Sequence, residues 1–336
     1  MRDEMKKAPR LRFRGFQEDW ELCKLKEIVD VRSGRDYKHL GSGNIPVYGT
    51  GGYMLSVSEA LSYDEDAIGI GRKGTINNPY ILKAPFWTVD TLFYAIPKNN
   101  FDLNFIYSIF RKINWKSKDE STGVPSLSKT TINAVTVYIP SGSEQQRIGE
   151  FFKQIDNTIT LHQRELDQLK ELKKAYLQLM FPVKDERVPK LRFADFEGEW
   201  EQCKFFDMWE KSSDRNKELK YSSKDVLSVA KMTKNPVERN SSDEYMKTYN
   251  ILHYGDIAFE GNKSKDYSFG RFVLNNLQDG IVSHVFIVFK PKVKMDIDFM
   301  KVYINNEYFM KHHLVKATTK TLMMTTLNVQ DMNKQK

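Results

Sequence analysis

The sequence is poor in cysteine: only Cys23 and Cys203 occur among its 336 residues. A disulfide scaffold and a zinc site with four cysteine ligands are therefore excluded. No apolar run reaches the roughly 18 residues that a membrane-spanning helix needs. The charged segment 1–14 also lacks the apolar run of a signal peptide. We therefore expect a cytoplasmic protein that makes no membrane contact.

Motifs of the common catalytic classes are also scarce. The six histidines form no H-E-x-x-H pattern, and the chain has neither a G-x-x-x-x-G-K-[ST] phosphate loop nor a serine nucleophile elbow. The acidic residues do not single out a metal-dependent nuclease, although the patterns of such sites are short and weak. We therefore predict no catalytic residue and no metal ligand in this chain.

Residues 68–80, IGIGRKGTINNPY, contain two patterns that resemble cofactor or base-modifying chemistry. Gly69, Gly71 and Gly74 form G-x-G-x-x-G, but no helix can begin in the TINNPYILK that follows, so the helix N-terminus that would hold a cofactor is missing. The Asn-Pro-Tyr at 78–80 lacks the second Pro of the amino-methyltransferase motif. The stretch is predicted to be a glycine-bearing turn and the chain to bind no cofactor. A self-contained methyltransferase or nuclease remains the enzymatic alternative.

An internal duplication organises the chain. Residues 9–25 (PRLRFRGFQEDWELCKL) and 189–205 (PKLRFADFEGEWEQCKF) are identical at nine of seventeen positions. Residues 126–140 align in turn with residues 326–336. Such a long period indicates two related domains and not a solenoid. We predict these domains at 1–142 and 183–336, with a spacer helix at 143–182 between them.

The spacer helix is predicted from a coiled-coil pattern. Residues 143–181 contain no Pro and one Gly, and ten positions alternate at spacings of four and three, eight of them apolar and two of them polar, His162 and Lys173. The positions predicted to pack against a partner helix are Ile148, Phe152, Ile155, Ile159, Leu166, Leu169, Tyr176 and Met180. Such a helix is about 55 Å long, which exceeds one turn of B-DNA, about 34 to 36 Å.

Both domains are predicted to be mixed α/β (α+β). Strands are expected at 45–54, 66–72, 86–97 and 134–140 in the first domain and at 255–261, 271–275 and 280–291 in the second. Helices are expected at 101–115 and 296–314, and the chain is expected to end in a strand.

Polar loops between these strands are predicted to contact double-stranded DNA. The net charge of +8 favours a polyanionic partner. Arg and Asn side chains suit base edges, and Lys and Thr suit phosphates. The predicted contacts are Arg35, Tyr37, Lys38, Arg72, Lys73, Thr75, Asn77, Asn78, Lys129, Asn262, Lys263, Lys265, Tyr267 and Arg271. Because the framework repeats while these loops differ, we expect the two domains to read different targets.

Taken together, the chain resembles the specificity subunit of a type I restriction-modification system. The resemblance is carried by 9–25 and 189–205, NIPVYGTGGY (44–53), residues 68–80, APFWTVDTLFY (84–94) and the run from 123 to 181. It implies two target recognition domains without catalysis, each reading one half of a split, asymmetric DNA target. It also implies two modification subunits, which bind S-adenosylmethionine and methylate adenine, and restriction subunits that cut unmodified DNA.

The family pattern includes a second long helix after the second domain, which the given sequence does not reach. We favour a fragment of a longer chain, and the alternative is a natural truncation whose single helix pairs with another copy. A coiled-coil scaffold that binds only proteins is a further, non-enzymatic alternative.

Overall fold

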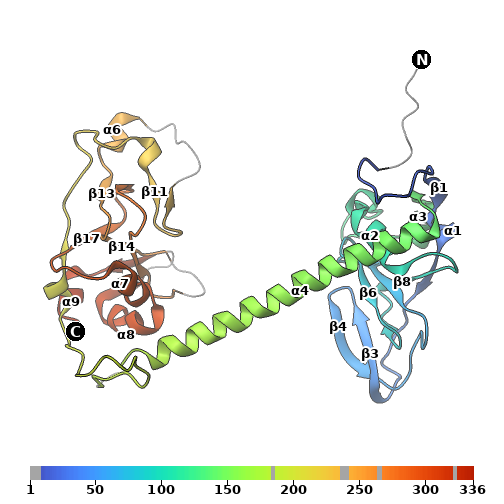
Figure 1. Cartoon of the computed structure of the whole chain (residues 1–336), viewed down its shortest axis with the longest axis horizontal. Helices are drawn as coiled ribbons and strands as arrows, with labels where there is room; N and C mark the ends of the chain where they lie inside the picture. Colours follow the sequence, from blue (N-terminus) through green and yellow to red (C-terminus); the bar gives the residue numbers. More distant parts are fainter. Residues whose placement is uncertain (1–8, 183–185, 235–241, 263–266, 321–323) are drawn as a thin grey trace. The chain divides into compact units, whose positions relative to one another are not determined.

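The computed structural model describes residues 9–182, 186–234, 242–262, 267–320 and 324–336. It divides into two compact units, Met1–Lys174 and Ala175–Lys336. Figure 1 shows their helices and strands, and each unit is described by itself.

The first unit is built on a four-stranded antiparallel sheet in the order β2–β8–β5–β6. The strands are β2 (Val29–Ser33), β8 (Leu92–Pro97), β5 (Ala67–Gly71) and β6 (Tyr80–Leu82). Every residue of β5 is buried. Side chains alternate between the two faces of a strand, so a central strand covered on both faces is apolar throughout.

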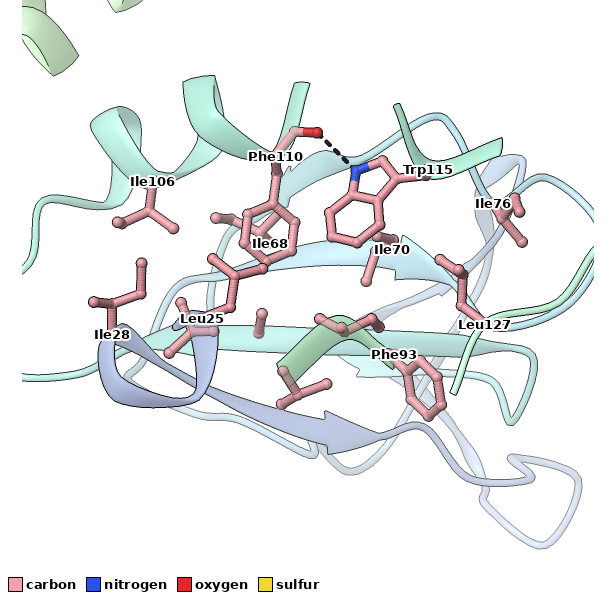
Figure 2. Packing of buried hydrophobic residues seen from close by; sticks show 14 of the residues in the cluster. Leu25, Ile28, Ile68, Ile70, Ile76, Phe93, Ile106, Phe110, Trp115 and Leu127 are labelled. Carbon is pink, nitrogen blue, oxygen red and sulfur yellow. Dashed lines mark hydrogen bonds between the residues drawn. The ribbon is translucent and has the colours of Figure 1, made fainter. Parts of the chain in front are cut away.

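One face of this sheet carries the main core of the unit. Ile68 and Ile70 pack there with Phe110 of α2 (Leu103–Lys112) and with Trp115, which begins a 3-10 turn, Trp115–Lys118. The Trp115 indole N–H donates to the Phe110 carbonyl at 2.7 Å (Figure 2). This bond satisfies a polar group that the core would otherwise bury unpaired.

Smaller elements complete the first unit. A second sheet has the order β4–β3–β7, with β3 (Ser42–Gly49), β4 (Gly52–Val57) and β7 (Trp87–Thr88). A two-stranded sheet pairs β1 (Glu21–Lys24) with β9 (Thr136–Ile139), and the short helices are α1 (Leu25–Ile28) and α3 (Lys129–Ala134).

The long helix α4 (Gly142–Leu179) begins against the first unit. Glu144, which is fully buried, accepts two hydrogen bonds of 2.7 Å from the Arg12 guanidinium. Gly149 lies so close to Asp102, the N-cap of α2, that an added Cβ would come within 2.1 Å of its carboxylate. These contacts fix the start of the helix, which confirms the predicted long helix at close to its predicted limits.

The second unit repeats the four-stranded sheet in the order β10–β17–β14–β15. Its strands are β10 (Trp209–Lys211), β17 (Ile287–Pro291), β14 (Ile257–Glu260) and β15 (Arg271–Leu274). The helices that accompany it are α5 (Phe205–Met208), α7 (Ile297–Ile304), α8 (Glu307–Ala317) and α9 (Val329–Asn333).

The remaining elements of the second unit are short. They are α6 (Asp243–Met246), the 3-10 turn Ser223–Asp225, β11 (Leu227–Ser228), β12 (Thr233–Lys234), β13 (Asn250–Leu252), β16 (Gly280–Val282), β18 (Thr318–Lys320) and β19 (Thr325–Leu327).

Equivalent backbone hydrogen bonds confirm the duplication. The Leu25 N–H donates to the Val135 carbonyl at 2.9 Å, and the Phe205 N–H donates to the Gln335 carbonyl at 2.8 Å. In each pair the donor opens the first short helix of its unit, and the acceptor follows the short helix α3 or α9. Leu25 and Phe205 are 180 residues apart, as in the alignment of 9–25 with 189–205. Val135 and Gln335 are 200 residues apart, as in the alignment of 126–140 with 326–336, so the structure agrees with both alignments.

Three predicted elements are in fact broken in two. The strand expected at 45–54 is the hairpin of β3 and β4, since Gly52 turns the chain with φ at 108°. Residues 86–97 and 280–291 each contain two strands that belong to different sheets. An alternation of apolar residues cannot show that a strand changes its pairing partner, which is why both predictions were wrong.

The helix expected at 296–314 is also divided, into α7 and α8. The side chain of Asn306 accepts a hydrogen bond from the Tyr308 N–H at 2.9 Å and so begins a new helix. The chain ends in α9 and not in the predicted strand, because Asn328 caps that helix through the N–H groups of Gln330 and Asp331.

We expect Arg12→Met to destabilise the first unit, because Glu144 would stay buried without its cationic partner. Arg192→Met is the matched control: Arg192 is the equivalent residue of the second copy, and the acceptors seen for it in the described residues are the carbonyls of Glu197 and Gly198. In urea unfolding followed by circular dichroism, Arg12→Met should shift the midpoint several times further than the control. Equal shifts would show that the buried ion pair does not hold the helix start.

The stability of the second unit should fall in acid because of His313. Burial, with a smaller contribution from His312, lowers the pKa of His313 to about 4, whereas a histidine in an unfolded chain titrates near 6.5. The unfolded chain therefore binds more protons between these values, and His313 lowers the stability by up to about 3 kcal/mol as the pH falls from about 6.5 to about 4.

Unfolding measured across this pH window should show a smaller acid loss for His313→Gln than for the wild type. His284, which is exposed, provides the control His284→Gln. Burial raises the pKa of Asp256 to about 6, so Asp256 stabilises the fold at low pH and loses this contribution as the pH rises. The wild type, His313→Gln and His284→Gln all retain Asp256, so this opposite effect is the same in each. Identical pH profiles for the three proteins would refute the assignment to His313.

Candidate nucleic-acid interface

Two predicted DNA-contacting loops leave the same edge of the first sheet. Strands β2 and β5 both pair antiparallel with β8 and therefore run in the same direction. The residues after them are fixed to the start of β8: the Gly34 N–H donates to the Leu92 carbonyl at 3.0 Å, and the Arg72 N–H to the Thr91 carbonyl at 2.8 Å. The loops beginning at Arg35 and Arg72 thus lie on either side of one strand.

A third segment joins this edge from much later in the chain. The Gly74 N–H donates to the Pro125 carbonyl at 2.8 Å, and the Leu127 N–H donates to the Arg72 carbonyl at 3.0 Å. The Asp119 carboxylate stabilises this third segment by accepting a hydrogen bond from the Ser126 N–H at 2.9 Å. This bond and those from Ser121 lower the pKa of Asp119.

These segments enclose an open cleft of about 400 Å³. It is lined by Ser33, Arg72, Lys73, Phe93, Ser126, Leu127, Ser128 and Lys129. The structure therefore brings together Arg72, Lys73 and Lys129, three of the residues predicted to contact DNA.

The charge of this cleft is positive and largely uncompensated. None of the ion pairs formed by the described residues includes Arg72, Lys73 or Lys129. The Arg72 guanidinium lies 5.8 Å from the centre of the Phe93 ring and donates to the Asp90 carbonyl at 3.4 Å. One carboxylate adjoins the cleft, since the Ser128 hydroxyl donates to Glu120 at 3.0 Å.

The other predicted residues of the first unit lie in the segments that follow β2 and β5. Arg35, Lys38, Thr75, Asn77 and Asn78 are exposed, whereas Tyr37 is half-buried against the core of the smaller sheet. The loop after β5 is anchored by Ile76, which is 1% exposed. At Gly71 an added Cβ would lie 2.1 Å from the Thr75 carbonyl oxygen, so only glycine permits this turn. Gly71 thus serves backbone geometry, as the predicted turn requires.

In the second unit, Asn262 occupies the place of Arg72. It follows Gly261, where an added Cβ would meet the Thr325 carbonyl oxygen at 2.1 Å, as at Gly71. The Thr325 N–H donates to the Gly261 carbonyl at 2.8 Å, and Asn262 is exposed. Lys263 and Lys265 lie outside the described residues, so their predicted contacts stay predictions.

Arg271 is held by contacts within its own unit. Its guanidinium forms an ion pair with Glu260 at 2.7 Å, donates to the Ala230 carbonyl at 2.7 Å and lies 4.5 Å from the centre of the Tyr267 ring. Burial lowers the pKa of Arg271, but the hydrogen bond and charge of Glu260 outweigh this effect and raise it. Arg271 and Tyr267 therefore support the loop as well as being candidates for a DNA contact.

The sequence patterns did not predict the serine hydroxyl groups and the phenylalanine ring that line the cleft. Ser33, Ser126, Ser128 and Phe93 all line it. Ser128 also caps α3, by accepting the Thr131 N–H at 3.0 Å. The aligned pair of segments at 126–140 and 326–336 contained a signal for Ser128, since the counterpart Asn328 is also a helix cap.

The predicted seam of α4 is mostly open to solvent. Ile148 packs on the core of the first unit, and Met180 is half-buried. The other predicted packing residues are Phe152 (45% exposed), Ile155 (38%), Ile159 (60%), Leu166 (46%), Leu169 (61%) and Tyr176 (46%). Such a stripe suits a partner helix.

Two further observations concern the described residues as a whole. None of their helices has both the length and the apolar character needed to cross a bilayer. No group of three His, Cys, Asp or Glu side chains among them is arranged to hold a metal ion.

Comparison with known proteins agrees with this arrangement. The family model of the type I restriction modification DNA specificity domain matches residues 17–171. This part of the chain is thus similar to the DNA specificity domain of type I restriction-modification systems. The match spans the first sheet, the cleft and most of α4.

The specificity subunit of the type I restriction enzyme MjaVIII from Methanocaldococcus jannaschii is 24% identical to the chain over 213 residues. This match covers 52% of the chain and 48% of that relative, so the chain spans about half the length of the curated relative.

One solved structure shares the fold, and a second shows a weaker likeness. The S subunit of a type I restriction-modification system from M. genitalium matches 97% of the chain and 90% of its own length with a TM-score of 0.61, at 12% identity. The HsdS subunit from Thermoanaerobacter tengcongensis matches 98% of the chain and 89% of its own length with a TM-score of 0.37, at 15% identity. The first of these likenesses covers both units and α4, in line with the predicted fold class.

Proposed function

We propose that this chain is a type I specificity subunit that reads double-stranded DNA, with each unit recognising one half of a split, asymmetric target. The observation that carries the proposal is the cleft of the first unit, where Arg72, Lys73 and Lys129 converge at the edge of the sheet that also presents the loop at 34–41. Cationic side chains that have no carboxylate partner suit DNA phosphates, and so do the hydroxyl groups beside them. The exposed Asn77 and Asn78 beside them suit base edges.

Unlike residues at equivalent positions support the asymmetry. The place of Arg72 is taken in the second unit by Asn262. Each follows a glycine at which an added Cβ would lie 2.1 Å from a carbonyl oxygen, that of Thr75 in the first unit and that of Thr325 in the second. One scaffold thus presents an arginine in one copy and an amide in the other. Since these side chains favour different bases, the two half-sites should differ.

The chain is proposed to have no catalysis of its own. In this account two modification subunits bind S-adenosylmethionine and methylate adenine, and restriction subunits complete the complex. The open seam of α4 offers these partners or a second helix an apolar surface. The relative named above is a specificity subunit of a type I restriction enzyme, which fits this division of labour.

Two alternatives make different predictions. A scaffold that binds only proteins would show no DNA affinity that weakens with salt. A self-contained methyltransferase would transfer methyl groups without a partner, and none of the sequence patterns supports one.

We expect Lys73 and Lys129 to bind phosphates and Arg72 to read a base edge. Replacing all three by Gln should therefore weaken binding to every duplex and also remove the preference for the first half-site. The slope of log K against log salt should become shallower by about 2, since each lost phosphate contact removes about 0.9. Fluorescence anisotropy with labelled duplexes, measured over a series of salt concentrations, would provide both numbers.

The control replaces Lys170, Lys173 and Lys174 of α4 by Gln, which removes the same charge away from the cleft residues. It should leave the slope nearly unchanged. Equal effects of the two triple variants would remove the cleft from the interface. A wild-type chain that binds no duplex, with its partner subunits present, would overturn the proposed function itself.

A further inference from the structure

A hairpin in the first unit lies beside one of the predicted DNA-contacting loops. It is formed by β3 and β4, which pair Gly49 with Gly52 across a two-residue turn. The Tyr80 hydroxyl donates to the Gly49 carbonyl at 2.5 Å. Tyr80 begins β6 and closes the loop that presents Asn77 and Asn78. The turn of the hairpin and this loop are therefore neighbours.

A second hydrogen bond fixes the hairpin to the same edge of the first sheet. The Val89 N–H donates to the Tyr48 carbonyl at 3.0 Å, shortly before β8 begins at Leu92. The ring of Tyr48 lies 6.1 Å from that of Tyr80 and 6.4 Å from that of Tyr53. A row of three tyrosine rings thus leads from β6 to the hairpin, where Tyr53 is 63% exposed.

The second unit has a hairpin at the equivalent place, formed by β11 and β12. As β3 runs parallel to β7, so Val226, directly before β11, bridges in parallel to Ile281 of β16. The Arg271 guanidinium donates to the Ala230 carbonyl, in the turn of this hairpin, at 2.7 Å. Arg271 is the first residue of β15, as Tyr80 is the first residue of β6. Unlike side chains at the same strand position therefore make the same contact.

The two hairpins differ in charge. Residues 42–57 contain no Asp, Glu, Lys or Arg, although these make up 29% of the chain and several would be expected in such a run. The first hairpin exposes Tyr53 and Met54 instead. The second exposes Lys231 and Lys234, and neither belongs to the ion pairs formed by the described residues. An uncharged surface suits base edges, whereas unpaired lysines suit phosphates.

We propose that this hairpin is a second DNA contact in each unit, beside the loop that follows β5 or β14. In the first unit Tyr53 contacts base edges, and in the second Lys231 and Lys234 bind phosphates. Tyr80 and Arg271 are positioning residues that hold the hairpins against the loops. The inference rests on the proposed function and adds to it an element that the sequence patterns did not indicate.

The first test uses the full natural chain with its modification subunits and a duplex that carries the mapped target. Tyr53→Ser should weaken binding to this duplex about tenfold, because a base contact is lost. Its affinity for an unrelated duplex and its slope of log K against log salt should not change, since no phosphate contact is lost. Tyr63→Ser is the control, because Tyr63 is 59% exposed but lies outside the hairpin.

Tyr80→Phe removes only the hydroxyl that holds the turn. It should weaken target binding about threefold in the wild type and not at all in the Tyr53→Ser background, because Tyr80 acts through the hairpin. Tyr138→Phe, which removes an exposed hydroxyl from β9, should have no effect in either background.

The second hairpin should give the opposite pattern. Replacing Lys231 and Lys234 by Gln should weaken binding to every duplex and make the salt slope shallower by about 2, while the methylated motif stays the same. Replacing Lys311 and Lys316 of α8, which are also exposed, removes the same charge and should leave the slope nearly unchanged.

The outcomes separate this inference from the proposed function. A wild-type chain that directs no methylated motif would contradict the proposed function itself. If the wild type directs a motif, and Tyr53→Ser binds the target as tightly as Tyr63→Ser does, DNA reading stands and the hairpin contact is refuted. Loss of the modification subunits from Tyr53→Ser, with unchanged affinity for DNA, would also refute it by assigning the hairpin to a protein partner.

Discussion

The antiparallel pairing of β8 with β2 and β5 is the constraint on which the functional surface depends. Two strands that flank a common antiparallel partner must end at the same edge, and the loops that follow them are then neighbours. The Leu92 and Thr91 carbonyls accept the N–H groups of Gly34 and Arg72 and so extend this pairing by one residue on each side. These hydrogen bonds fix the residues at which both loops begin. The loops can therefore vary in sequence while their origins stay in place, which is what a scaffold that reads different targets requires.

A second constraint is the ion pair between Arg12 and the buried Glu144 at the start of α4. A buried carboxylate is tolerated only where a cation and hydrogen bonds compensate for lost water. The pair therefore specifies where the helix begins and which of its faces meets α2. After Ile148, which packs on the core of the first unit, the apolar stripe from Phe152 onwards is exposed, so a partner can reach it.

The sequence predicted the features that depend on local pattern or on repetition. The periodicity of 143–181 predicted α4, and the paired openings at 9–25 and 189–205 predicted the duplication. It did not predict the cleft, because the segments around Arg72 and Ser126 are distant in the sequence and are joined by backbone hydrogen bonds that no sequence pattern shows. Nor could apolar alternation show that residues 280–291 divide between two sheets. The charges of Lys73 and Lys129 alone predict a DNA contact, whereas the fold shows that both residues line one cleft.

In the proposed function, two related units of one chain read two different half-sites. The most direct measurement expresses the chain, at its full natural length, with and without its genomic neighbours in a host free of other type I systems. N6-methyladenine is then mapped across the host DNA by long-read sequencing. We predict a split, asymmetric motif that appears only when this chain and the modification subunits are both present. A symmetric motif, or no new motif while the partner subunits are active with another specificity subunit, would contradict the account.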